Sequence, residues 1–142
     1  MQELGFTATI AAPFLAAKEQ VTRALAAEGF GVLTHIDVTA TLQAKLGEKM
    51  EPYEILGACN PALAHAALSV HRNIGLLLPC NVVLREVGEV TEVSIVNPQA
   101  MFGAVPDGAR ASLDGVVHEA HARLARVAAA LKDEVDGGAA AG

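Results

Sequence analysis

The chain has no tryptophan, and phenylalanine and tyrosine together make up only 4 % of its 142 residues. Apolar residues nevertheless account for 52 % of the sequence, and alanine supplies much of that share. A chain of this length can bury a core without metal ions or disulfide bonds. We therefore expect a single domain with an aliphatic core, in which helices pack closely through alanine.

Clusters of basic residues are also missing. The chain carries 10 Lys and Arg against 16 Asp and Glu, a formal charge of −6. Nucleic-acid binding depends on Lys and Arg groups that neutralise phosphates, and an acidic chain is repelled by anionic membrane surfaces for the same reason. We predict neither nucleic acid nor a membrane among its partners.

Long hydrophobic runs are absent as well, and we expect no secretory leader. The longest strongly apolar run, residues 74–79, is far shorter than the roughly 20 residues of a membrane-spanning helix. The first residues contain Glu3, lack a basic start and are interrupted by Pro13. We expect a cytoplasmic protein, in which Cys59 and Cys80 are reduced thiols rather than a structural disulfide.

Motifs of the common enzyme classes do not occur. The chain contains no GxGxxG or Walker loop, no GxSxG and no HExxH. Its two cysteines stand 21 residues apart, which is neither a CxxC redox motif nor a zinc-finger spacing. The sequence therefore leaves open whether the protein is an enzyme.

The first part of the chain predicts a strand, a helix and a second strand. Residues 6–10 alternate apolar and polar side chains. Pro13 suits the first turn of a helix, and Gly29 suits its end. The second strand is predicted to carry Phe30, Val32, Thr34 and Ile36 on one face and Leu33, His35 and Asp37 on the other.

The middle of the chain predicts a short helix, a third strand and another helix. Asp37, Thr39 or Thr41 would cap a helix through Leu42 and Leu46 that ends at Gly47. A third strand is expected to place Tyr53, Ile55, Gly57 and Cys59 on one face. Asn60 is a good N-cap and Pro61 fits the first position of a helix that extends to Ser69.

The second half predicts a hairpin and a long helix. Residues 75–87 form a long apolar strand in this interpretation, with Pro79 marking a bulge, an edge or a late start of pairing. A turn at Gly88 leads to a partner strand over residues 90–96, and residues 101–108 form a loop or a single turn. Residues 109–135 follow helical spacing. These elements amount to about five strands and four helices, an α+β order.

Two blocks around the cysteines resemble the DUF302 family, a bacterial and archaeal family without an assigned general function. They are Tyr-Glu-Ile-Leu-Gly-Ala-Cys-Asn-Pro over residues 53–61 and Gly-Leu-Leu-Leu-Pro-Cys-Asn-Val-Val over residues 75–83. The resemblance implies a two-layer α+β sandwich of mostly antiparallel strands with helices on one face, commonly a homodimer. It implies one domain over residues 1–136 and no catalytic mechanism. Residues 137–142 contain nothing to anchor them and are expected to form a flexible tail.

The resemblance also singles out two Cys-Asn pairs, Cys59-Asn60 and Cys80-Asn81, as candidate ligand-binding residues. Cys59 is expected where a strand ends and a helix begins, and the free N–H groups and partial positive charge of a helix N-terminus stabilise a thiolate or an anionic ligand. In the structural alternative, Asn60 only caps the helix and Cys59 is a small buried hydrophobic residue.

Histidines suggest two possible metal sites. Cys59 and Cys80 would suit a soft metal ion such as Cu(I), or Zn with further ligands, for which His35 and His65 are candidates beside His71. A separate stripe on the last helix, at spacing i, i+4 and i+7, would let two or three ligands converge on a metal ion, although a polar flank or a dimer rim is its ordinary explanation. Its members are Asp114, His118 and His121.

Three functions follow from these patterns. We rank first a cytoplasmic binding domain that, as a homodimer, holds a small ligand or a soft metal ion near the two Cys-Asn pairs. An interaction module in which the cysteines only pack ranks second. A thiol enzyme with Cys59 as nucleophile and Cys80 as resolving partner ranks third, because acid–base machinery is not visible.

Overall fold

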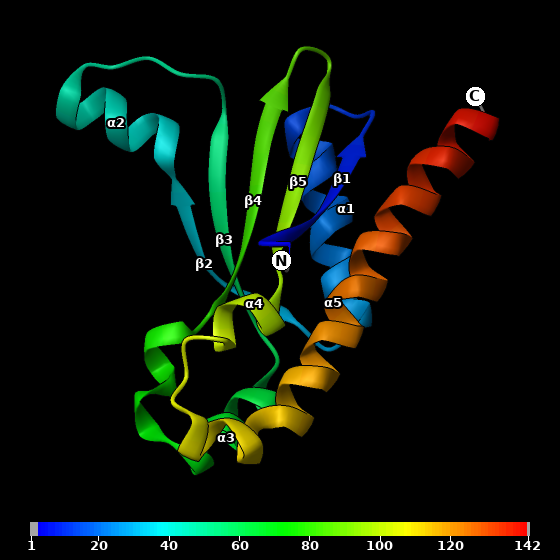
Figure 1. Ribbon diagram of the computed structural model, residues 1–142. Coiled ribbons are helices and arrows are strands. Elements are labelled where there is room, and N and C mark those ends of the chain that lie inside the picture. The colour runs from blue at the N-terminus through cyan, green and yellow to red at the C-terminus, as the bar shows by residue number, and fades with distance from the viewer. Residues whose placement is uncertain (1–2, 142) are drawn as a thin grey trace.

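A single antiparallel sheet organises the molecule (Figure 1). The computed structural model describes the backbone of residues 3–141 and the side chains of residues 3–132. Within that range five strands are ordered β1-β5-β4-β3-β2, and every neighbouring pair is antiparallel. The strands are β1 (Gly5–Ile10), β2 (Gly31–Asp37), β3 (Tyr53–Cys59), β4 (Cys80–Val87) and β5 (Val90–Val96).

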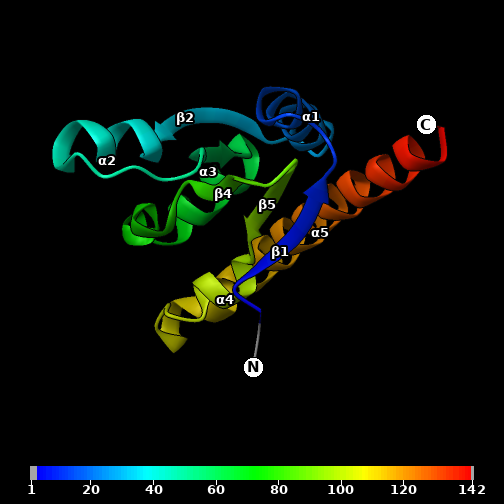
Figure 2. The same ribbon diagram turned by 90° about the horizontal axis from the view of Figure 1, so that it is seen from above.

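Helices connect and cover the strands. They are α1 (Phe14–Ala27), α2 (Val38–Leu46), α3 (Pro61–Val70), the 3-10 helix η1 (Arg72–Leu77), α4 (Pro98–Phe102) and α5 (Asp107–Ala141). In both views α1 and α5 lie on one side of the sheet, while α2 stands away from them at the far end of β2 (Figures 1 and 2). The predicted α+β fold with helices on one face and a long C-terminal helix is confirmed.

The main core lies between the sheet and the two long helices. Alternate strand residues point into it, together with one stripe of α1 and one of α5. Burial of each large aliphatic side chain contributes about 1.5–3 kcal/mol. The largest fully buried members of this cluster are Ile10, Leu25, Leu56, Leu84, Ile95, Leu124 and Leu131.

A second, smaller core holds the end of the molecule where α3, η1, α4 and α5 meet. Its buried residues are Ala67, Ile74, Phe102, Val105 and Leu113. This cluster explains one wrong prediction, the long strand over residues 75–87. Residues 72–77 instead form η1, whose Ile74 packs into the second core, and β4 begins only at Cys80. Pro79 has no N–H group for a sheet ladder, so pairing starts just after it.

The predicted faces of β2 are also wrong. Directly opposed residues of an antiparallel pair point to the same side of a sheet. Val32 is opposite the buried Ala58, whereas Ile36 is opposite Ile55 on the other face. The register shifts between Val32 and Thr34, so the extra residue of this bulge reverses the alternation that the sequence suggested.

Most local signals act as the sequence predicts. The Ala40 N–H donates to Asp37 Oδ1 over 2.9 Å and begins α2, and Gly47 ends that helix with a φ of 68°. Gly88 has a φ of 61° in the β4–β5 turn. Residues 98–102 form the short helix α4, whereas the sequence predicts a strand up to residue 96 and a loop or a single turn over residues 101–108.

The C-terminal helix is longer than predicted. Its backbone is helical to Ala141, beyond the expected end at residue 135. The prediction of a flexible tail over residues 137–142 stays a prediction, and the side chain of Val135 lies outside the described ones. Among the described helices, none is both long and apolar enough to span a membrane.

Candidate functional site

The two cysteines lie on neighbouring strands at the same end of the sheet. Ala58 of β3 is directly opposite Cys80 of β4, so Cys59 stands one residue beyond that pair. Both thiols are free. The two strands that carry the thiols are therefore neighbours, and the thiols are not joined by a disulfide bond.

Asn60 fixes the junction between β3 and α3. Its Oδ1 accepts a hydrogen bond of 3.2 Å from the Leu63 N–H, and its backbone carbonyl accepts another of 2.9 Å from the Ala64 N–H. The side chain is buried and packs against Gly29, where a Cβ would stand 2.8 Å from Asn60 Nδ2. Asn60 is thus the helix cap that the sequence predicts, and Gly29 leaves room for it.

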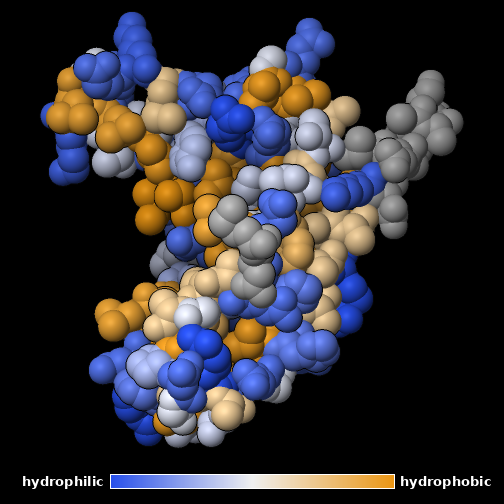
Figure 3. Space-filling view, viewed as in Figure 1, coloured by the Kyte–Doolittle hydropathy of each residue, from blue (hydrophilic) through white to orange (hydrophobic). Residues whose placement is uncertain are grey.

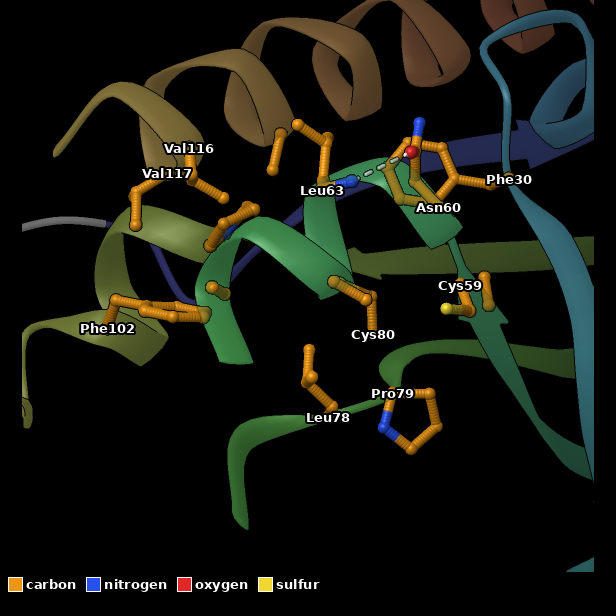
Figure 4. A pocket seen from close by; sticks show the side chains of 15 residues that line it. Phe30, Cys59, Asn60, Leu63, Leu78, Pro79, Cys80, Phe102, Val116 and Val117 are labelled. Atoms are coloured by element: carbon orange, nitrogen blue, oxygen red, sulfur yellow. Dashed lines mark hydrogen bonds between the residues drawn. The ribbon is translucent and has the colours of Figure 1, made fainter. Parts of the chain in front are cut away.

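A small cavity of about 40 Å³ lies beside this junction (Figure 4). A space of this size accommodates a small group or a few water molecules. The end of the sheet, α3, the segment before β4, α4 and α5 all contribute to its walls. Around Cys59, Asn60 and Cys80 the walls are apolar, formed among others by Phe30, Leu63, Leu78, Pro98, Phe102, Val116 and Val117.

Burial sets the protonation of Cys80. Its side chain is almost fully buried, and the loss of hydration raises the pKa of the thiol to about 11, with a further contribution from the neighbouring Cys59. Cys80 is therefore a neutral thiol near pH 7. A neutral buried thiol packs as a small apolar group, and it is poorly suited to act as a nucleophile.

Asn81 lies apart from the other three predicted ligand-binding residues. Because Cys80 points into the core, Asn81 points to the opposite face of the sheet, where it is exposed. It lines a shallow hollow of about 440 Å³ over β1, β4 and β5. The cavity thus brings together Cys59, Asn60 and Cys80, and the strand alternation separates Asn81 from them.

The predicted histidine ligands also lie elsewhere. His35 Nε2 is 3.2 Å from Glu54 Oε1 and also contacts Lys18 Nζ. Lys18 Nζ is 3.1 Å from Glu54 Oε2, but this ion pair lacks hydrogen-bond geometry. His65 is exposed on α3. Within the described part of the chain, no three His, Cys, Asp or Glu side chains are grouped so that they could hold a metal ion.

The histidine stripe of the last helix is divided between two surroundings. The His121 ring packs edge-on against Phe6, with ring centroids 5.2 Å apart. Asp114 and His118 instead line a hollow of about 470 Å³ beside Arg110. The helical spacing is as predicted, but the three side chains do not converge.

Sequence reasoning missed the part of the cavity wall that α4 provides. Pro98 and Phe102 line the cavity from α4, whereas the sequence predicts no more than a loop or a single turn over residues 101–108. One signal was present, because Asn97-Pro98 repeats the pattern of Asn60-Pro61. Asn97 caps α4 through a 2.9 Å hydrogen bond from the Gln99 N–H to its Oδ1.

Fold and site together define a small two-layer α+β domain with an apolar, thiol-bearing cavity at one end of its sheet. The chain belongs to the DUF302 family, whose sequence model, described as "Domain of unknown function DUF302", matches residues 6–131. It is similar to an uncharacterized conserved DUF302 protein from Bacillus stearothermophilus, with 28 % sequence identity and a TM-score of 0.79. That match covers 94 % of this chain and 99 % of the other. No curated protein matches the sequence.

Proposed function

We propose that this domain is a cytoplasmic, homodimeric binding protein that holds a small, largely apolar molecule in the cavity beside Cys59, Asn60 and Cys80. The observation that carries the proposal is the cavity itself, which converges on three of the four residues selected from the sequence. Apolar pockets with a few polar groups are the usual form of small-molecule sites.

The apolar lining of the cavity supports an uncharged ligand. A charged group would lose its hydration among these apolar side chains, and Cys80 is neutral, so it offers no compensating charge. The side-chain amide of Asn60 supplies a polar group at one end. Because the cavity measures only about 40 Å³, the ligand is an uncharged molecule of a few heavy atoms, or the apolar end of a larger one.

Xenon is a suitable probe, because it enters dry apolar cavities without a specific chemical group. In methyl-resolved NMR, xenon should shift the signals of Leu63, Leu78, Val116 and Val117. Ala64→Leu fills the cavity from α3 and should abolish these shifts, whereas Ala62→Leu, exposed on the same helix, should retain them. Wild-type protein without localised shifts would refute the proposal.

A soft metal ion is the second candidate ligand, because two free thiols line one cavity. Cu(I) binds thiolates, so Cys80 would have to release its proton and apparent affinity would rise with pH. Titration with Cu(I) under reducing conditions tests this idea. One equivalent bound by wild type and none by Cys59→Ser or Cys80→Ser would support it, and equal uptake by all three would exclude it.

The two other functions make different predictions. A thiol enzyme requires that Cys59 react with iodoacetamide with a pH midpoint below the free-thiol value of about 8.5. An interaction module requires that the double variant Cys59→Ser/Cys80→Ser be less stable than wild type. It also requires that neither xenon nor Cu(I) bind, even to the wild-type protein. Both measurements use the same variants as the binding experiments.

A further inference from the structure

A second space adjoins the cavity of the candidate site. It measures about 470 Å³ and lies between α4 and the N-terminal part of α5. Phe102 and Val117 line both spaces and so form a wall that the two share. Figure 4 shows both side chains at the end of the cavity that lies away from Cys59. We call the second space the polar hollow, after the polar side chains in its lining. They are Gln99, Arg110, Asp114 and His118.

The positive charge in the polar hollow is already paired. Arg110 Nη2 donates to the carbonyl oxygens of Gly103 over 2.6 Å and of Val105 over 2.8 Å. Its Nη1 is 3.4 Å from Asp107 Oδ1, so the guanidinium charge is offset within the chain. Asp114 lies one turn further along α5, and no ion pair or hydrogen bond among the described side chains includes it. The carboxylate of Asp114 is therefore the charge that the polar hollow offers to a ligand.

Two further groups lie around that carboxylate. His118 is four residues after Asp114, and residues at this spacing are neighbours on a helix surface. Gln99 lines the same space from α4. A carboxylate, an amide oxygen and an imidazole nitrogen all accept hydrogen bonds, and an ammonium group has three N–H donors to give. The polar hollow thus suits a small cationic head group.

The cavity and the polar hollow differ in polarity. In Figure 3 hydrophilic residues with hydrophobic patches between them cover the lower part of the molecule, where α4 and the start of α5 lie. The cavity behind the shared wall is apolar, so a charge placed there would lose its hydration without compensation. A molecule that occupies both spaces therefore has an apolar chain on one side of the wall and a charged end on the other.

We propose that the ligand is a linear aliphatic amine, whose hydrocarbon tail enters the cavity between Phe102 and Val117 and whose ammonium group lies beside Asp114 in the polar hollow. This inference rests on the proposed function and selects one of its alternatives, in which the cavity receives the apolar end of a larger molecule. Phe102 belongs to α4, which has only five residues. A helix this short depends on its packing, so a shift of Phe102 that admits the tail disturbs little regular structure.

Titrations of the protein with hexylamine, hexanol and hexanoate near pH 7, followed by methyl-resolved NMR, test the ligand class. Hexylamine should bind most tightly and shift the cavity methyl signals of Leu63 and Leu78. Hexanol has the same tail without the charge and should bind less tightly, and hexanoate should bind least, because Asp114 repels its carboxylate. Equal affinities for the three probes would overturn the proposal, and so would tighter binding of hexanoate than of hexylamine.

Asp114→Asn tests the head-group contact. It should weaken hexylamine binding about three- to fivefold, as expected for a partly exposed ion pair, and leave hexanol binding unchanged. Glu89→Gln is the matched control, because it removes the same charge from an exposed side chain at the β4–β5 turn, at the opposite end of the sheet from the cavity. It should bind hexylamine as wild type does. Equal weakening by both substitutions would contradict a specific contact with Asp114.

Xenon separates this inference from the proposed function. Asp114→Asn should retain the xenon shifts, whereas Ala64→Leu should lose both the xenon shifts and hexylamine binding. Wild type that takes up xenon but not hexylamine would overturn the amine site and leave the apolar cavity as a binding site. Hexylamine binding that persists in Ala64→Leu would also overturn the inference, because the tail would then lie outside the cavity.

Discussion

Cys59 and Cys80 stand at almost neighbouring positions, but their surroundings give them different chemistry. Cys80 points into the main core and keeps its proton, while Cys59 is partly exposed where β3 ends. One thiol therefore shapes the cavity wall, and the other is accessible at its edge. Near pH 7, the nucleophilic thiolate of the buried residue is scarce.

The raised pKa of Cys80 makes stability depend on pH. The unfolded chain loses the thiol proton near pH 8.5, but the folded chain holds it until about pH 11. The protonated thiol therefore makes its full contribution to the free energy of unfolding below pH 8.5. This contribution, about 3 kcal/mol in total, is lost as pH rises to 11.

Cys80→Ala should lack this loss. Urea unfolding under reducing conditions at pH 7, 9 and 10.5 should show wild type more stable than Cys80→Ala at pH 7. The difference in free energy of unfolding between the two should shrink steadily at higher pH. A difference that stays constant with pH would contradict the buried, protonated thiol.

Gly57 lies in β3 on the face of the sheet that points away from the main core, close to the side chains of Thr34 and Pro79. A Cβ there would overlap Thr34 Oγ1 and stand 2.7 Å from Pro79 Cγ, so Gly57→Ala should cost about 1–3 kcal/mol. Gly115→Ala is the control, because no atom outside the neighbouring residues and the backbone of α5 itself lies within 4 Å of its Cβ position. The control should gain up to about 1 kcal/mol from helix propensity. Chemical denaturation of both variants measures the contrast, and equal effects would contradict the close contact.

At the scale of elements, the residues of the candidate site depend on the junction between β3 and α3. The strand delivers Cys59 to the cavity, and the cap at Asn60 turns the chain so that Leu63 and Ala64 face the same space. The Asn97 cap does the same for Phe102 on α4. Because β3 and β5 run in the same direction, both junctions lie at the same end of the sheet.

The cap at Asn60 can be tested apart from its place in the cavity. Asn60→Ala removes the acceptor of the Leu63 N–H and should lower the free energy of unfolding by about 1 kcal/mol. Asn60→Ser keeps a capping oxygen and should retain most of that stability. If serine is as destabilising as alanine in urea unfolding, the amide contributes through packing against Gly29 instead.

At the scale of the whole molecule, α1 and α5 complete one side of the sheet, and the proposed function pairs two such chains. If folding and association are linked, the thermal midpoint of the protein should rise by about 2–4 °C for each tenfold increase in protein concentration. Scanning calorimetry measures this midpoint, and a midpoint that does not vary with concentration would count against the dimer.

The sequence by itself determined the local features of this protein. Helix caps, glycine ends and period-two alternation are decided by neighbouring residues, so α1, α2, α3, β5 and the β4–β5 turn were predicted with nearly their observed bounds. Cys59, Asn60 and Cys80 were likewise selected through the repeated Cys-Asn pattern, and all three line one cavity.

Only the tertiary structure decided which residues meet. The bulge after Val32 reversed the faces of β2, and the second core drew residues 72–77 out of the expected strand and into η1. Asn81 points away from the cavity because the pleat alternates, and His35 pairs with Glu54 across strands far apart in the sequence. These outcomes depend on packing between distant segments, which local sequence patterns do not encode.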